Sequence, residues 1–173
     1  MLAALRGLIT DHSPGRAAKT AAMLDELLQQ GVKQTGSKSV SVKLDADAMA
    51  QANEPSGKPD DFDQLDVQLT LLAALDYSEK SKDKTPADLL AEKLTALGEG
   101  LKPPRAAPRP GFFWEFYAPF FSELTQKGYA PTLAYLVQSR RPDVPPDVTA
   151  WLAQHPQQLK ELNEWAVAYQ WPK

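Results

Sequence analysis

Cysteine is absent from this sequence of 173 residues, and histidine occurs only twice. The lack of cysteine excludes disulfide bonds, thiolate metal ligands and a cysteine nucleophile. The histidines, His12 and His155, lack the spacing of metal ligands, and we interpret both as structural or surface residues. No GxGxxG or Walker phosphate-binding motif occurs, which disfavours a nucleotide-driven enzyme. We therefore expect neither a cofactor nor a bound metal.

A long hydrophobic run and a basic surplus are also missing. The longest strongly apolar stretch, residues 67–75, is far shorter than the roughly 20 residues of a transmembrane helix. The formal net charge is −3, whereas nucleic-acid binders draw much of their affinity from cationic contacts with phosphates. We expect a soluble protein without a nucleic-acid partner, in the cytoplasm rather than the periplasm. Its oligomeric state stays open.

The two halves of the sequence differ in composition. Of the 15 aromatic residues, 13 follow residue 100, and 11 of the 15 prolines do so as well. Between the halves, residues 101–110 contain four prolines and three cations, which is typical of an extended connector. We predict an acidic lobe rich in leucine and alanine over residues 1–100, this connector, and a lobe rich in aromatics and proline over residues 111–173.

Helical periodicity and proline positions predict an all-α fold of about seven helices, arranged as antiparallel hairpins. Proline is well tolerated in the first turn of a helix, because its missing N–H has no partner there in any case. In a helix expected from about Asp61, Leu71 and Leu75 widen the apolar stripe. The expected helix starts include Pro14, Pro86, Pro119, Pro131, Pro146 and Pro156.

Two features qualify this all-helical prediction. Residues 39–45 alternate in polarity as strands do, but no second strand is evident in the sequence. We interpret them as an extended segment or as one arm of a minor hairpin. The helix that begins at Pro86 is expected to end at Gly98, because glycine commonly follows the last turn of a helix.

Four carboxylates gather in the seven residues 60–66. Hard oxygen ligands of this kind bind divalent cations, but the spacing matches no metal-binding motif and no second acidic group follows. We interpret the cluster as capping the amino end of a helix, where the free N–H groups and the helix dipole favour negative charge.

Seven aromatic residues occur in the ten residues 112–121. One helix face offers only a limited apolar stripe to a core, so this number exceeds what a single face can bury. Three interpretations follow. The rings form a core shared with the first half of the chain, they form a surface for a partner or ligand, or they insert into a membrane.

We predict a non-catalytic helical interaction module, a scaffold or adaptor that binds a protein partner through its carboxyl-terminal lobe. Large aromatic side chains dominate the energetics of protein interfaces. A small basic rim adds charge beside them. The candidate contact residues are Phe113, Trp114, Phe116, Tyr117, Arg140, Arg141 and Trp151.

Two alternatives remain open. In the first, the chain is a small-ligand binder or an enzyme with a pocket between the lobes, walled by Trp114, Tyr117 and Trp151. Glu115 or Glu123 would then supply a polar contact, and burial among aromatic rings would raise the pKa of such a carboxyl. In the second alternative, the chain is a purely structural domain.

Overall fold

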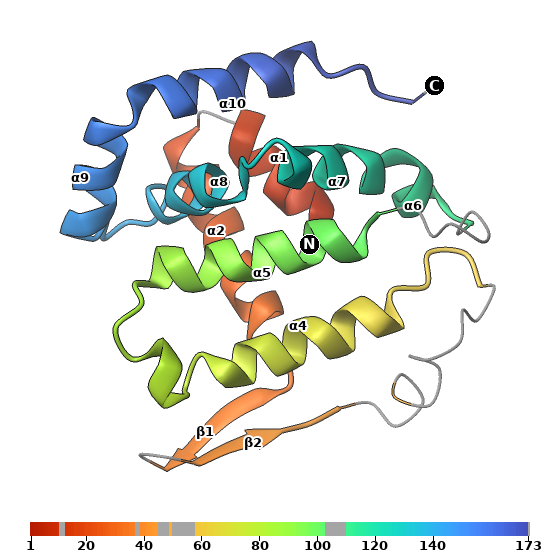
Figure 1. Cartoon of the computed structure of the whole chain (residues 1–173), viewed down its shortest axis with the longest axis vertical. Coiled ribbons are helices and arrows are strands. Elements are labelled where there is room, and N and C mark those ends of the chain that lie inside the picture. Colours follow the sequence, from red (N-terminus) through yellow and green to blue (C-terminus); the bar gives the residue numbers. More distant parts are fainter. Residues whose placement is uncertain (11–12, 37–38, 45–48, 50–57, 103–109, 173) are drawn as a thin grey trace.

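The computed structural model describes residues 1–10, 13–36, 39–44, 49, 58–102 and 110–172. Most of these residues are helical, and the one sheet among them is a two-stranded hairpin, which confirms the prediction of a mainly helical protein (Figure 1). The elements are α1 (Leu2–Thr10), α2 (Pro14–Leu28), β1 (Val32–Gly36), β2 (Ser39–Val42), α4 (Asp63–Leu75), a short 3-10 turn (Glu79–Ser81), α5 (Pro86–Gly100), α6 (Phe112–Phe116), α7 (Ala118–Gln126), α8 (Ala130–Gln138), α9 (Pro146–Gln154) and α10 (Pro156–Ala168).

Proline lies in the first turn of α2, α5, α7, α8, α9 and α10, as predicted. The start of α5 is fixed further by a reciprocal cap. The Thr85 hydroxyl accepts a hydrogen bond from the Asp88 amide at 3.1 Å, and the Asp88 carboxylate accepts one from the Thr85 amide at 3.0 Å. Two of the free N–H groups at this helix end are thereby satisfied.

The predicted strand has a partner that the sequence pattern did not reveal. β2 pairs with β1 in antiparallel register, with Val32 opposite Val42 and Gln34 opposite Val40. β1 escaped notice because most of its side chains are polar and exposed, so it lacks the alternation of a half-buried strand. The hairpin adjoins α4 at one edge of the molecule, shown at the bottom of Figure 1.

Helix α5 lies at the centre of the fold, with α4 on one side and α7 and α8 on the other (Figure 1). Helix α1 packs against α2, α8 and α10. One hydrophobic core therefore contains side chains from both halves of the sequence, among them Leu5, Leu24, Phe120, Leu133 and Leu162, each at most 1% exposed. The division into two lobes stays a prediction, and residues 103–109 of the expected connector lie outside the described residues.

None of the helices in the described part of the chain combines the length and the apolarity needed to cross a membrane.

Helix α5 continues past Gly98 to Gly100, so the expected end at Gly98 was wrong. Gly98 instead permits close packing of α5 on α7. A Cβ atom added there would overlap the Thr125 side chain and lie 2.9 Å from the carbonyl oxygen of Phe121. Such a separation is shorter than Cβ atoms tolerate, and backbone atoms of α7 cannot move aside cheaply.

This contact gives a prediction for stability. We expect Gly98→Ala to lower the free energy of unfolding by about 1–3 kcal/mol, the usual range for overpacking. The matched control is Gly7→Ala in α1, where an added Cβ has no neighbour within 4 Å among the described residues. This control should instead gain about 0.5–1 kcal/mol from helix propensity. Urea denaturation of both variants measures the difference, and equal effects would contradict the packing role of Gly98.

Candidate functional site

The aromatic helix α6 is held in place by the acidic segment that precedes α4. Asp60 Oδ1 accepts hydrogen bonds from the amides of Phe113 at 2.7 Å and Trp114 at 3.4 Å. Gly111 has φ 123°, and a Cβ there would overlap Asp60, so only glycine fits this approach. The predicted capping role of the acidic cluster thus extends to a helix from the other half of the sequence.

Trp114 anchors the same contact from the side of α6. Its ring stacks on Phe62 with 4.7 Å between the centroids, and its Nε1 donates to the carbonyl oxygen of Asp61 at 2.8 Å. Trp114 is only 6% exposed, and Tyr117 is 9% exposed. These two predicted contact residues therefore lie inside the core and offer little surface to a partner.

The aromatic surface that remains is a series of contacting rings. Phe112 lies 5.4 Å from Phe113 and 5.2 Å from Phe116, and Phe116 stacks on Trp171 at 4.7 Å between centroids. Phe112 and Phe113 are 58% and 39% exposed, while Phe116 and Trp171 are half-buried. We call these four residues the aromatic ladder. The guanidinium of Arg6 lies over the Trp171 ring at 4.2 Å, which places a cation at the inner end.

The sequence-based set omitted two members of the ladder. The predicted contact residues include Phe113 but not Phe112, although both occupy the same aromatic run. Trp171 follows the end of α10 and returns to contact Phe116 and Phe120. The signal that could have found Trp171 is a large aromatic residue just beyond the last helix, where a polar tail is more usual.

The remaining predicted site residues lie elsewhere. Trp151 stacks between Tyr135 and His155, at 4.2 Å and 4.1 Å between centroids, in a second and smaller core cluster. Arg140 and Arg141 follow the end of α8. Helix α9, which carries Trp151, is at the opposite end of the molecule from α6 (Figure 1). The structure does not bring Trp114, Tyr117 and Trp151 together as pocket walls.

Glu115 and Glu123, the candidate polar contacts of an enzyme pocket, also lie in different surroundings. Glu115 is exposed, while Glu123 accepts a hydrogen bond from Trp165 Nε1 at 2.9 Å. His155 Nδ1 lies 2.8 Å from the carbonyl oxygen of Trp151, and His12 is outside the described residues. Within the described ranges, no group of three or more acidic or histidine side chains is arranged to hold a metal ion.

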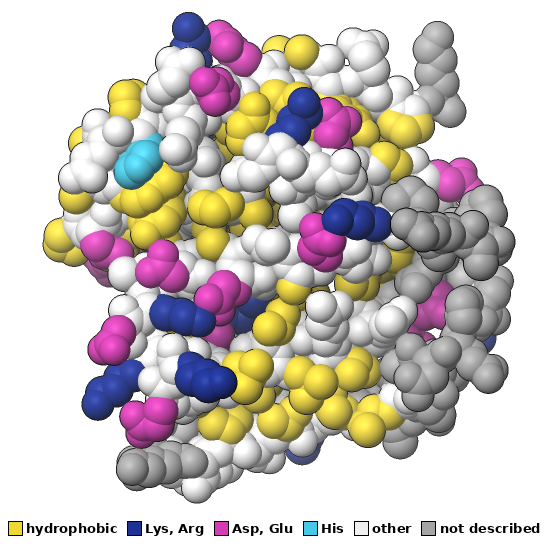
Figure 2. Space-filling model, in the orientation of Figure 1, with side chains coloured by type: hydrophobic (Ala, Val, Ile, Leu, Met, Phe, Trp, Pro, Cys, Tyr) yellow, Lys and Arg dark blue, Asp and Glu magenta, His cyan; other side chains and the backbone are white. Residues whose placement is uncertain are grey.

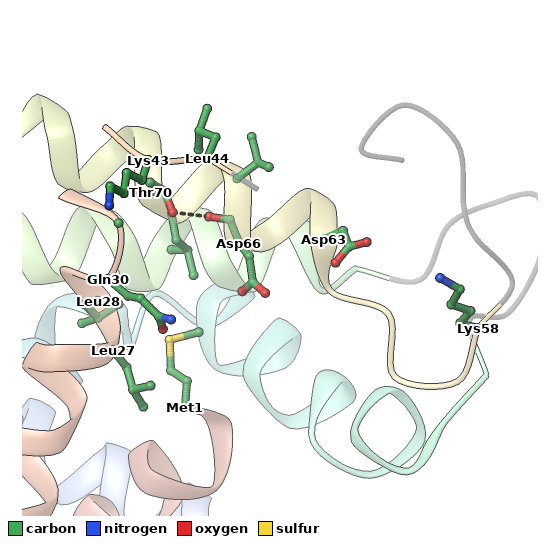
Figure 3. Close-up of a pocket in the computed structure, with 13 residues that line it drawn as sticks. Met1, Leu27, Leu28, Gln30, Lys43, Leu44, Lys58, Asp63, Asp66 and Thr70 are labelled. Atoms are coloured by element: carbon green, nitrogen blue, oxygen red, sulfur yellow. Dashed lines mark hydrogen bonds between the residues drawn. The ribbon is translucent and has the colours of Figure 1, made fainter. Parts of the chain in front are cut away.

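A groove of about 940 Å³ lies between the end of α2, the segment after β2, and α4 (Figure 3). Leu27, Leu28 and Val67 contribute apolar surface, and Lys43 and Asp66 contribute charge. Asp66 points towards Met1 in this view. The sequence offered no signal for this groove, because its walls come from segments that are distant in the sequence.

Helix α4 leaves a second apolar surface open. Leu71 and Leu75 are 48% and 57% exposed, so the apolar stripe that they were expected to widen extends beyond the buried face of α4. The buried face of α4 is formed by Leu65, Leu69 and Ala73. Figure 2 shows hydrophobic side chains gathered over α4 and the adjoining hairpin.

Comparison with known proteins gave no relative: no family model, no curated protein sequence and no solved structure matches this chain.

Burial of Trp114 and exposure of Phe112 predict opposite responses to truncation. Trp114→Ala should lower the free energy of unfolding by about 3–5 kcal/mol, as expected for a buried aromatic residue. Phe112→Ser should change it by less than about 1 kcal/mol, because most of its ring is already in water. Thermal or urea unfolding of the two variants tests this assignment. A larger loss for Phe112→Ser would mean that the ladder belongs to the core.

The pKa of Asp66 makes the stability of the fold depend on pH. Burial, reinforced by repulsion from Asp63 and Asp61, raises the pKa of Asp66 above its ordinary value. The carboxyl of Asp66 therefore binds a proton more tightly in the folded state than in the unfolded state. Above the folded-state pKa, the ionised carboxylate lowers the stability of the fold. We expect Asp66→Asn to raise the urea midpoint at pH 7.

This gain should shrink as the pH falls through the raised pKa of folded Asp66, and it should be small below about 4, where the wild-type carboxyl is largely protonated in both states. Asp83→Asn, at an exposed position, controls for the loss of one negative charge. An equal gain for Asp66→Asn at pH 7 and at low pH would show that ionisation of Asp66 is not its cause.

Proposed function

We propose that this chain is a non-catalytic interaction module that binds a protein partner through the aromatic ladder. The observation that carries the proposal is the run of contacting rings from exposed Phe112 and Phe113 to half-buried Phe116 and Trp171. Clustered aromatic residues at the centre of a contact surface supply most of the binding energy in many interfaces.

The contacts that hold α6 in place support this proposal. Asp60 accepts hydrogen bonds from the amides of Phe113 and Trp114 in the first turn of α6, and Trp114 stacks on Phe62. The exposed rings are thereby held before a partner arrives, so that binding orders few side chains. Preorganisation of this kind increases affinity, since less conformational entropy is lost on association.

The chemistry of the ladder indicates the kind of partner segment that it would accept. The rings offer flat apolar surface to a large apolar or aromatic side chain, through offset stacking or edge-to-face contact. Arg6 offers a cation beside Trp171 for an acidic group on the same segment. The partner segment is therefore expected to combine an apolar anchor with a neighbouring carboxylate.

The experiment compares a ladder variant, Phe112→Ser/Phe113→Ser, with a control variant, Leu71→Ser/Leu75→Ser. Each removes two exposed hydrophobic side chains, but the control changes α4. Immobilised wild-type protein and both folded variants are incubated with lysate of the source organism, and retained proteins are identified by mass spectrometry. We expect a partner that the wild type and the α4 variant retain and that the ladder variant loses.

A photoreactive phenylalanine analogue at position 112 then locates the contact directly. It should crosslink to the partner, whereas the same analogue at position 71 should not. A partner that the ladder variant still retains, or crosslinking from position 71 alone, would contradict the proposal. Retention of no protein by the wild type would favour the interpretation as a purely structural domain.

A further inference from the structure

A second pocket, of about 290 Å³, lies between α2, the turn after α4, α5 and the end of α8. Its volume is near the lower end of the range of small-molecule sites, roughly 300–1,000 Å³. The pocket brings together groups that are distant in the sequence. The Arg141 guanidinium donates to Asp25 at 2.5 Å across a separation of 116 positions.

The pocket contains two acid–base pairs. Besides Arg141 and Asp25, the Lys93 ammonium lies 2.5 Å from the carboxylate of Asp76, and Lys93 is only 5% exposed. Burial raises the pKa of Asp25 and of Asp76, and the neighbouring cations oppose that shift. Two cations thus face two carboxylates. A ligand with a net charge would upset this balance in a partly desolvated site, whereas an electrically neutral ligand would keep it.

The residues that line this pocket include both a hydrogen-bond acceptor and hydrogen-bond donors that have no partner in the described part of the chain. Among the described residues, Gln138 Oε1 and Arg141 Nε are buried and have no hydrogen-bond partner. Gln138 lines the pocket and is 3% exposed. Lys93 carries three N–H donors, and the structure gives it one acceptor within the described ranges. An unpaired buried polar atom lowers stability, so its presence beside a cavity points to a ligand that satisfies it.

The rest of the wall is apolar. Leu28, Leu89 and Leu90 line the pocket beside the charged pairs. A fitting ligand therefore has no net charge, carries both donors and acceptors, and ends in a short apolar group. We propose that this pocket binds a small zwitterion, namely an α-amino acid with an apolar side chain. The ammonium group binds Gln138 Oε1 and the carboxylates, the carboxylate group binds Arg141 and Lys93, and the side chain lies against the leucines.

The test uses L-leucine as the probe and isothermal titration calorimetry as the readout. Two compounds each carry one half of the zwitterion on a similar apolar group: 4-methylpentanoate lacks the ammonium, and 3-methylbutylamine lacks the carboxylate. We expect leucine to bind with a dissociation constant of about 1 mM or below. Each half-ligand should bind at least about tenfold more weakly, because it leaves one set of polar groups unpaired.

Gln138→Met separates ligand binding from a structural role. It removes the unpaired oxygen at similar volume, so the ligand-free protein should melt at the same temperature as the wild type or higher. Leucine binding should nevertheless weaken at least about tenfold, the loss expected for a hydrogen bond to a charged group. Gln34→Met on exposed β1 is the matched control and should bind leucine as the wild type does.

Three results would overturn the proposal. The first is absence of leucine binding to the wild type up to about 10 mM, tenfold above the weakest expected dissociation constant. The second is a half-ligand that binds as tightly as leucine. The third is wild-type affinity in Gln138→Met. This site does not include the aromatic ladder, so these results do not bear on the proposed protein partner.

Discussion

The close packing of α5 against α7 and α8 is the constraint on which the rest of the structure depends. Gly98 lets the backbone of α5 approach Phe121 and Thr125, and Leu94 and Leu97 continue the same buried face. Because α5 belongs to the first half of the sequence and α7 and α8 to the second, this contact joins the two halves in one core.

Polar contacts reinforce that central packing. The Tyr135 hydroxyl on α8 donates to Asp88 at 3.2 Å, in addition to the cap that Asp88 forms with Thr85. Burial acts to raise the pKa of Asp88, but the hydrogen bonds from Thr85 and Tyr135 outweigh it, and the pKa lies below its ordinary value. The ionised carboxylate therefore stabilises the folded state, and this contribution is lost as the pH falls through the folded pKa.

The features that could be predicted from the sequence were local ones. Proline positions gave most helix starts, because these depend on a few consecutive residues. Where a helix ends, and which of its faces is buried, depends on residues that are distant in the sequence. Gly98 resembles a helix stop until α7 lies against it, Asp60 caps a helix 53 positions away, and the pairing of Asp25 with Arg141 spans 116 positions. No periodic pattern encodes such contacts.

The two proposed sites follow from the same central packing. The aromatic ladder needs α6 in place beside α4, and the charged pocket needs α2 and α8 on either side of α5. Native-state hydrogen exchange tests the claim of one shared core most directly. If the core is shared, the slowest amides of α5, α7 and α8 exchange with one common free energy, equal to that of global unfolding. Protection of α7 and α8 that persists while α5 exchanges through a smaller opening would contradict it.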